Sequence, residues 1–221
     1  MHSEVTTPIL HGDVKPVNIL LDDDFVPKIS DFSASRMLTS DKRHAELPIG
    51  QPGYIDPAHH VGELTSESDV YSFAIVLLEL ITRKKPSHHD ISSLRLSSDD
   101  TGTKINTVVQ LVDPDIKGDI KLFRSLAKII LQCLNPSIDQ RPKMADIAER
   151  LKYLAKRCRA NRNKMGHLSN VFQHSISYVS EYKLNKESRS EFSLCVIEAY
   201  LDFACYSAIC FISLNCSYIF T

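Results

Sequence analysis

The segment 69–82 constrains the fold of this chain most, because its side chains are apolar on nearly every side of a helix. Ser68, directly before it, is a residue type that commonly caps a helix N-terminus. A helix of about 14 residues is too short to span a bilayer, which needs about 20. The segment therefore predicts a helix in the middle of a globular core.

Two short strands are predicted ahead of this helix. Apolar β-forming residues within 9–21 and 26–29 favour extended backbone, and the acidic run 22–24 between them indicates a turn. Residues 34–64 contain Gly, Pro, His and Ser without a sustained period. They are predicted to form one long loop, and a loop of this length in a compact domain is usually functional or disordered.

Two more helices are predicted after the helix at 69–82. Apolar residues recur at helical spacing within 122–133, at Leu122, Leu126, Ile129, Ile130 and Cys133. A final helix is predicted from Arg141-Pro142 through Leu154, with proline in its first turn. The Ser- and Asp-rich residues 83–107 are predicted to be a loop. The fold class is therefore α+β, mainly helical with a short β element.

Composition excludes several classes of function. The 26 Lys and Arg residues nearly balance 27 Asp and Glu residues, so no basic field suits nucleic acid or an anionic membrane. The six cysteines form no C-x-x-C pair, which disfavours a zinc site and a secreted disulfide framework. The N-terminus has no apolar region of a signal peptide. Reduced thiols inside a cell are the favoured interpretation.

The character of the chain changes near residue 158. Residues 1–157 are predicted to be one domain, and the polar, aperiodic residues 158–191 a disordered linker. Residues 192–221 form an apolar, Cys-rich tail. Within it, 203–221 carry no charge but several polar residues, so membrane insertion would be marginal. An altered exon is the favoured alternative to a true anchor.

Five short segments, in a fixed order, contain most of the residues suited to chemistry. The first alone is a weak signal, since its polar residues also suit a turn. The segments are His11-Gly-Asp-Val-Lys-Pro-Val-Asn18, Asp31-Phe-Ser33, Gly50-Gln-Pro-Gly-Tyr-Ile-Asp-Pro-Ala58, Ser68-Asp-Val-Tyr-Ser-Phe-Ala74, and Cys133-Leu134 followed by Asp139-Gln-Arg-Pro142.

In order and spacing these segments resemble the protein kinase motifs H-R-D-x-K-x-x-N, D-F-G, G-T-x-G-Y-x-D-P-E, S-D-V-Y-S-F-G and C-L-x-x-x-x-x-x-R-P. Residues 1–157 resemble the C-terminal lobe of the plant wall-associated receptor-like Ser/Thr kinases. The resemblance implies a protein-kinase-like fold and transfer of the ATP γ-phosphate to Ser or Thr hydroxyls of protein substrates, with Mg²⁺. It places the parent receptor's kinase on the cytoplasmic side of the plasma membrane, and the chain alone in the cytoplasm; the oligomeric state stays open.

The resemblance assigns roles to four residues. Asp13 would accept the proton of the substrate hydroxyl, and Lys15 would neutralise charge on the transferring phosphoryl group. Asn18 and Asp31 would hold Mg²⁺ and, through it, the ATP phosphates.

No segment of the sequence resembles the Gly-rich loop, the β3 lysine or the αC glutamate that grip ATP. The family's helix before the catalytic loop is also missing, which is expected to expose a broad apolar face of the helix at 69–82. We therefore expect the isolated chain to be inactive and poorly soluble. The alternative function is that of an inactive pseudokinase or remnant that acts, if at all, as a binding module.

Two substitutions fall within the catalytic motifs. Gly12 replaces an arginine that in the family pairs with a phosphorylated activation loop, so phosphorylation of Thr39 or Ser40 would lack that cationic partner. Ser33 replaces the D-F-G glycine, where a side chain is expected to bring backbone strain and weaker Mg²⁺ binding.

Three further substitutions follow. Ala58 replaces a glutamate that in the family pairs with the arginine matching Arg141, and an uncompensated buried charge would cost about 3–5 kcal/mol unless Asp139 or water compensates. Gln51 replaces a threonine that contacts the catalytic aspartate. Ala74 for glycine is a milder change.

Two histidine pairs are the remaining candidate metal ligands, His59-His60 and His88-His89. Without cysteines or carboxylates at ligand spacing, they are interpreted as solvated loop residues.

Overall fold

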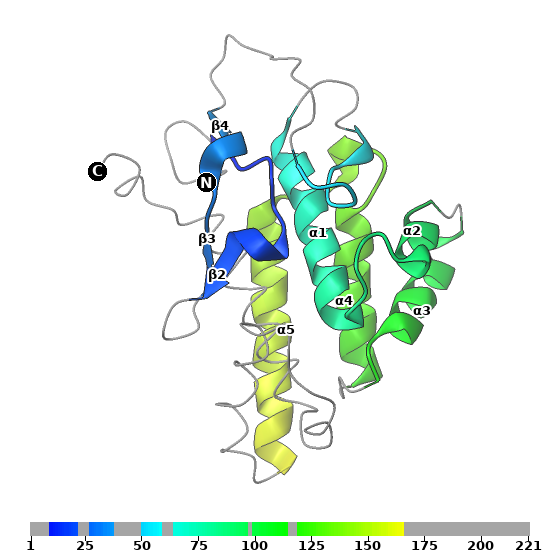
Figure 1. The fold of residues 1–221 in the computed structure, drawn as a ribbon. Helices are drawn as coiled ribbons and strands as arrows, with labels where there is room; N and C mark the ends of the chain where they lie inside the picture. Colours follow the sequence, from blue (N-terminus) through cyan, green and yellow to red (C-terminus); the bar gives the residue numbers. More distant parts are fainter. Residues whose placement is uncertain are drawn as a thin grey trace, which may run out of the picture.

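The computed structural model describes residues 9–21, 27–37, 50–58, 64–96, 99–114 and 119–165 (Figure 1). The α-helices are α1 (Ser66–Thr82), α2 (His89–Leu96), α3 (Thr101–Leu111), α4 (Ile120–Cys133) and α5 (Met144–Met165). The strands are β1 (Ile9–Leu10), β2 (Ile19–Leu21), β3 (Pro27–Ile29) and β4 (Arg36–Met37). Three 3₁₀ turns are η1 (Pro16–Asn18), η2 (Phe32–Ala34) and η4 (Ile138–Gln140).

The strands form two small antiparallel pairs beside α1. β1 pairs with β4, placing Leu10 opposite Arg36, and β2 pairs with β3, placing Leu20 opposite Lys28. The expected short β element is confirmed. It brings residues 9–21 and 27–37 to one side of α1, while α2 and α3 lie on the other side (Figure 1).

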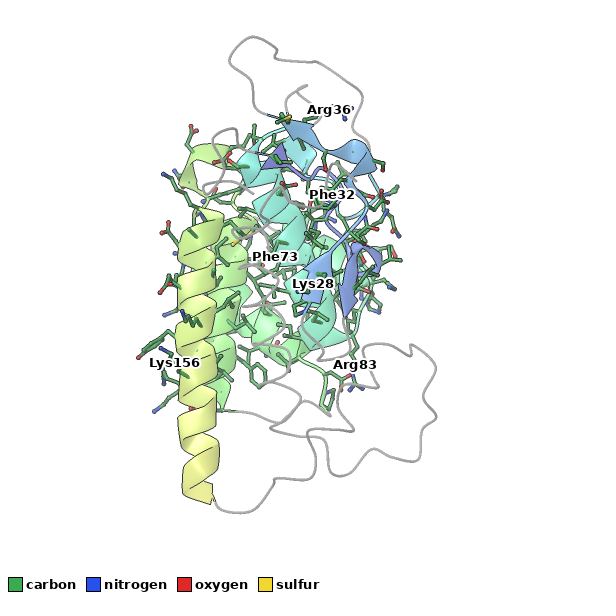
Figure 2. All side chains as sticks on the ribbon, turned by 90° about the vertical axis from the view of Figure 1, so that its left-hand side faces the viewer. Lys28, Phe32, Arg36, Phe73, Arg83 and Lys156 are labelled. Atoms are coloured by element: carbon green, nitrogen blue, oxygen red, sulfur yellow. The ribbon has the colours of Figure 1, made fainter. Side chains whose placement is uncertain are left out.

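Helix α1 is the centre of the core, as its sequence predicts. Its apolar side chains from Val70 to Ile81 are buried apart from Leu80, which is partly buried, and Phe73 is fully enclosed (Figure 2). The broad exposed apolar face expected from the missing preceding helix is therefore not observed on α1. Poor solubility, which was inferred from that face, stays a prediction.

The start of α1 differs from its prediction by one turn. Thr65, rather than Ser68, is the N-cap, and its Oγ1 accepts the backbone N–H of Ser68 at 3.3 Å. The Ser68 hydroxyl accepts the N–H of Thr65 in return, at 3.4 Å. Ser68 is thus the third helical residue of a capping box rather than the cap.

The loop predicted at 83–107 is wrong, because α2 and most of α3 occupy it. Each helix buries a narrow apolar strip, Ile91 and Leu94 in α2 and Ile105 and Val108 in α3. Asp100 caps α3 by accepting the N–H groups of Gly102 (2.7 Å) and Thr103 (3.1 Å). The acidic and hydroxyl residues that indicated a loop include this helix cap.

Helices α4 and α5 are confirmed, with a later start for α5. All five predicted apolar positions of α4 are buried, and so are Met144, Ile147, Ala148, Leu151 and Leu154 of α5. α5 begins at Met144 because Arg141 ends the η4 turn. It continues past position 158 to Met165, so the polar segment predicted to begin at 158 starts within a helix. The domain boundaries stay predictions.

The tail at 192–221 and its membrane alternative lie outside the described residues. Within the described part of the chain, no helix combines the length and the apolar character needed to cross a membrane.

Candidate active site

The loop formed by residues 11–18 is held against the start of α1 by Asp69. The Asp69 carboxylate accepts the backbone N–H groups of His11 at 2.8 Å and Gly12 at 2.9 Å. Asp69 is buried, so these bonds to backbone donors satisfy a charge removed from water. The central helix thereby fixes the position of the loop.

His11 connects this loop to Ser30, the residue directly after strand β3. Its Nδ1 accepts the backbone N–H of Asp13 (3.3 Å), so the neutral ring carries its hydrogen on Nε2, which donates to the carbonyl of Ser30 (2.9 Å). The ring meets Phe32 edge-on, with centroids 5.2 Å apart. His11 is fully buried and serves as packing and hydrogen-bonding support.

Asp13, Lys15 and Asn18 come together at the end of this loop. Lys15 Nζ lies 2.6 Å from Asp13 Oδ2. Asn18 Nδ2 donates to the same Oδ2 at 3.1 Å and to the Asp13 backbone carbonyl at 2.8 Å. Asp13 Oδ1 is buried and has no hydrogen-bond partner among the described residues. One oxygen of this carboxylate is therefore bonded to Lys15 and Asn18, and the other has no partner among the described residues.

Asp31 is exposed at the start of η2. Its Oδ1 accepts the Ser33 hydroxyl at 2.7 Å and the Ser33 backbone N–H at 3.3 Å. These two bonds, the hydroxyl first, lower the pKa of Asp31, and the charge of Lys15 adds to the effect. Asp31 is therefore ionised at neutral pH.

The strain expected at Ser33 is instead at Asp31. Asp31 has φ 62° and ψ 76°, in the left-handed region, whereas Ser33 lies in the η2 turn with a negative φ. The expectation that serine itself adopts a glycine-type backbone is wrong. An aspartate tolerates this conformation better than most residues because its side chain bonds locally.

Gly12 occupies a position that admits no larger residue without a shift. Its φ is +82°, and a Cβ placed there would lie 2.9 Å from the Ala34 carbonyl oxygen and 3.1 Å from Leu64 Cδ2. The backbone oxygen of Ala34 cannot swing aside as a side chain does. Thr39 and Ser40, the candidate phosphorylation sites, lie outside the described residues.

A family model described as the protein kinase domain matches residues 1–153. The chain belongs to the protein kinase family. It is 39% identical over 161 residues to wall-associated receptor kinase-like 3 of Arabidopsis thaliana, covering 68% of this chain and 21% of that protein. Wall-associated receptor kinase 1 of the same plant is 34% identical over 166 residues, covering 70% of this chain and 22% of the relative. The chain spans about a fifth of the length of these curated relatives.

Membership agrees with the mostly helical α+β architecture, and protein kinases in general use ATP and Mg²⁺. Asn18 and Asp31 stay predicted Mg²⁺ ligands, and the oxygen atoms they offer are of the type that this ion takes. Because the amide nitrogen of Asn18 is bonded to Asp13, its carbonyl oxygen is the atom left to ligate. Asp31 adds a carboxylate, and hard oxygen donors are the ligands that Mg²⁺ prefers.

Arg141 of this kinase domain is fully partnered, contrary to the expectation from Ala58. Asp56 Oδ2 and Oδ1 accept from the two terminal nitrogens of Arg141 at 2.5 and 3.0 Å, and both side chains are 1% exposed. Asp139, the partner suggested by the sequence, is exposed instead. The uncompensated charge predicted at Arg141 is therefore wrong, since Asp56 supplies the carboxylate two residues earlier.

The same arginine is held by three further contacts. Its guanidinium donates to the backbone carbonyls of Asn135 (2.8 Å) and Glu67 (3.0 Å). It also lies over the ring of Tyr71, 5.2 Å from the ring centroid. The pair with Asp56 thus joins the segment 50–58 to the start of α1 and to the turn before α5. The sequence contains one signal for this pair, because Asp56 lies in the segment 50–58 that resembles a protein kinase motif.

A second buried contact holds the segment 50–58 on α1. The Tyr54 hydroxyl donates a short hydrogen bond to Glu79, whose other carboxylate oxygen lies 2.6 Å from Lys85 Nζ. Ser72 Oγ donates to the Tyr54 carbonyl at 2.8 Å. Gly50, at the start of the segment, lies beside Asp13: a Cβ there would be 3.5 Å from Asp13 Oδ1. Gln51 is exposed.

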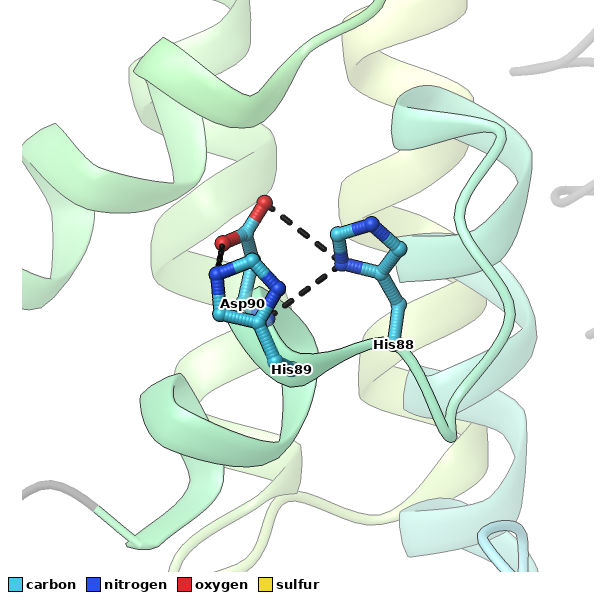
Figure 3. Close-up of side chains that lie close together, drawn as sticks. All are labelled: His88, His89 and Asp90. Carbon is cyan, nitrogen blue, oxygen red and sulfur yellow. Dashed lines mark hydrogen bonds and ion pairs between the residues drawn. The ribbon is translucent and has the colours of Figure 1, made fainter.

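His88, His89 and Asp90 form a small cluster at the start of α2 (Figure 3). His89 Nε2 lies 2.7 Å from Asp90 Oδ1, and His88 Nδ1 lies 3.5 Å from Oδ2. The carboxylate of Asp90, next to the two histidines, is a possible ligand that the sequence prediction did not include. However, Lys84 Nζ already lies 2.5 Å from Asp90 Oδ2, and a helix N-terminus disfavours a cation. The solvated interpretation stays the prediction here; His59 and His60 lie outside the described residues.

Proposed function

We propose that this chain supplies the catalytic lobe of a protein serine/threonine kinase, which transfers the γ-phosphate of ATP to hydroxyl groups of protein substrates. The proposal rests on one observation: the side chains of Asp13, Lys15 and Asn18 contact one another on a loop that is hydrogen-bonded to the central helix. Lys15 lies 2.6 Å from Asp13, and Asn18 bonds the same carboxylate. Phosphoryl transfer depends on this kind of positioning and charge neutralisation.

In this proposal Asp13 accepts the proton of the substrate hydroxyl through Oδ1. That oxygen is buried and without a hydrogen-bond partner among the described residues, so it is the acceptor still available. Oδ2 is occupied by Lys15 and Asn18, which hold the carboxylate in one orientation. Lys15 places a positive charge beside the developing charge of the transferring phosphoryl group.

Asn18 and Asp31 would hold Mg²⁺, which would supply positive charge to neutralise the phosphates of ATP. The Asn18 contribution is its amide oxygen, because its nitrogen donates twice to Asp13. Asp31 contributes a carboxylate whose ionised form is favoured by Ser33.

Serine/threonine specificity is supported by the position of Lys15, which tyrosine kinases usually lack, and by the similarity to wall-associated receptor kinases. A parent receptor of that kind would place this lobe on the cytoplasmic side of the plasma membrane, with proteins as substrates.

The proposal is tested with a chimaera that joins this chain to the nucleotide-binding lobe and preceding helix of a wall-associated relative. We expect ATP-dependent phosphorylation of a protein substrate at serine or threonine. Asp13→Ala should lower the rate at least about a hundredfold, the scale of a lost general base. A matched control is Asp139→Ala, an exposed carboxylate outside the site. Equal activity of the Asp13→Ala and unmodified chimaeras would refute the proposed role.

The alternative, a non-catalytic binding module, applies to the 221 residues by themselves. We predict that the purified chain transfers no phosphate from ATP to a generic substrate, because no segment of it matches the Gly-rich loop and lysine that grip ATP. Radiolabel incorporation measures this directly. Activity that disappears in the Asp13→Ala variant of the same chain would contradict the prediction.

A further inference from the structure

Ser33 brings a hydroxyl to a place where the family motif has glycine. Its Oγ lies 2.7 Å from Asp31 Oδ1, closer than its own backbone nitrogen at 3.3 Å. A glycine at this position would offer only the longer backbone bond. The hydroxyl is therefore an additional group acting on Asp31.

Both donors of Ser33 reach the same oxygen of Asp31. Two hydrogen bonds use the two lone pairs of Oδ1, which leaves Oδ2 as the open oxygen. Without the hydroxyl, only the longer backbone bond would orient the carboxylate, whose terminal torsion is otherwise broad. With it, the carboxylate has one preferred orientation relative to η2.

Ser33 is the main group that orients the Asp31 side chain among the described residues. Asp31 is exposed and accepts its described hydrogen bonds from Ser33 alone, so no buried neighbour fixes its rotamer. Its backbone is in the left-handed region, held in place between β3 and η2. The next residue, Phe32, packs edge-on against the buried His11 and thereby holds the turn in place.

We propose that Ser33 is a positioning residue, whose hydroxyl fixes the Asp31 carboxylate so that Oδ2 alone is presented to a divalent cation. The inference rests on the proposed function, because it takes Asp31 as a metal ligand. Groups that hydrogen-bond a ligating carboxylate commonly change metal affinity by 10- to 100-fold when they are removed. Ser33 would thus add a hydrogen-bond donor that a glycine at this position lacks.

The test uses Mn²⁺ alone as the probe, with free Mn²⁺ in the presence of the 221-residue chain measured by electron paramagnetic resonance. Ser33→Ala and Ser33→Gly are expected to weaken Mn²⁺ binding about tenfold. Ser33→Thr keeps the hydroxyl and is expected to retain the affinity within about threefold. The matched control is Ser35→Ala, since the Ser35 hydroxyl donates to the His11 carbonyl at 3.3 Å instead. Circular dichroism verifies that each variant stays folded.

The Asp31→Ala variant distinguishes the metal-binding role of Asp31 from the positioning role of Ser33. If it leaves Mn²⁺ binding unchanged, or if the unmodified chain binds no Mn²⁺, the metal role of Asp31 is wrong and the proposed function loses that residue. If Asp31→Ala removes binding while Ser33→Ala has no effect, only the positioning role is overturned. Tighter binding by Ser33→Ala would likewise overturn it, since the hydroxyl would then be a competitor of the cation.

Discussion

Arg141 and Asp56 form a buried ion pair to which the side chain at position 58 contributes no charge. Both side chains are 1% exposed, and the guanidinium binds both carboxylate oxygens. Bidentate pairing of this kind is geometrically specific. Because Asp56 occupies the partner position, Ala58 leaves no buried charge unpaired.

We predict that Asp56→Ala destabilises the chain by about 3–5 kcal/mol, because it leaves the Arg141 charge buried without its partner. The free energy of unfolding in urea measures the change. Asp139→Ala, the exposed carboxylate, is the control and should alter stability by less than about 0.5 kcal/mol. Equal effects of the two substitutions would show that Asp56 is not the partner that matters.

Gly12 is required by geometry rather than by chemistry. We predict that Gly12→Ala destabilises the chain by about 1–2 kcal/mol, the cost of a left-handed backbone for an L-residue, with more from the contact to the Ala34 carbonyl. Urea unfolding checks the value. A neutral Gly12→Ala would disprove the constraint.

At the scale of elements, the sequence predicted the helices whose apolar residues recur along their whole length. It did not predict the helices that bury only two apolar residues each. α4 repeats apolar residues over its whole length, and all its predicted positions are buried. α2 and α3 each bury two residues only, and their polar remainder resembles a loop. Their helical state depends on the core that they cover and on caps such as Asp100.

The Asp100 cap gives a pH-dependent prediction. The Thr103 hydroxyl, followed by backbone N–H groups, lowers the pKa of Asp100 below its usual 3.8. A lowered folded-state pKa means that the stabilisation is present above the unfolded value and is lost as pH falls through the folded one. Asp100→Asn keeps a capping side chain without the charge. The stability difference between the wild-type chain and this variant should therefore shrink below pH 3.8, measured by urea unfolding across pH. A difference independent of pH would contradict it.

At the scale of the whole molecule, α1 joins the parts of the domain. α4 packs against α1 and α3, α5 packs against α4, and Asp69 and Glu79 of α1 hold the loop 11–18 and the segment 50–58. All the buried apolar side chains of the described residues except Leu10 and Ala34 belong to one core cluster. The site is therefore built on a single hydrophobic unit.

We predict that Phe73→Ala lowers stability by about 3–5 kcal/mol, since its side chain is fully buried at the centre of that core. The unfolding curve should keep a single transition with the same slope, because the core is one cooperative unit. Tyr153→Ala, at a side chain 61% exposed, is the control and should have a small effect. Two separate transitions would show that the helices and the site fold independently.

The sequence by itself determined the family, the central helix, the two later helices and the loop that contains Asp13, Lys15 and Asn18. Those features depend on local spacing and periodicity, which one chain displays in full. Only the tertiary structure decided that Asp56 partners Arg141, 85 residues away, and that the left-handed residue is Asp31 rather than Ser33. Such outcomes depend on which groups meet in space, and the order of residues along the chain does not specify that.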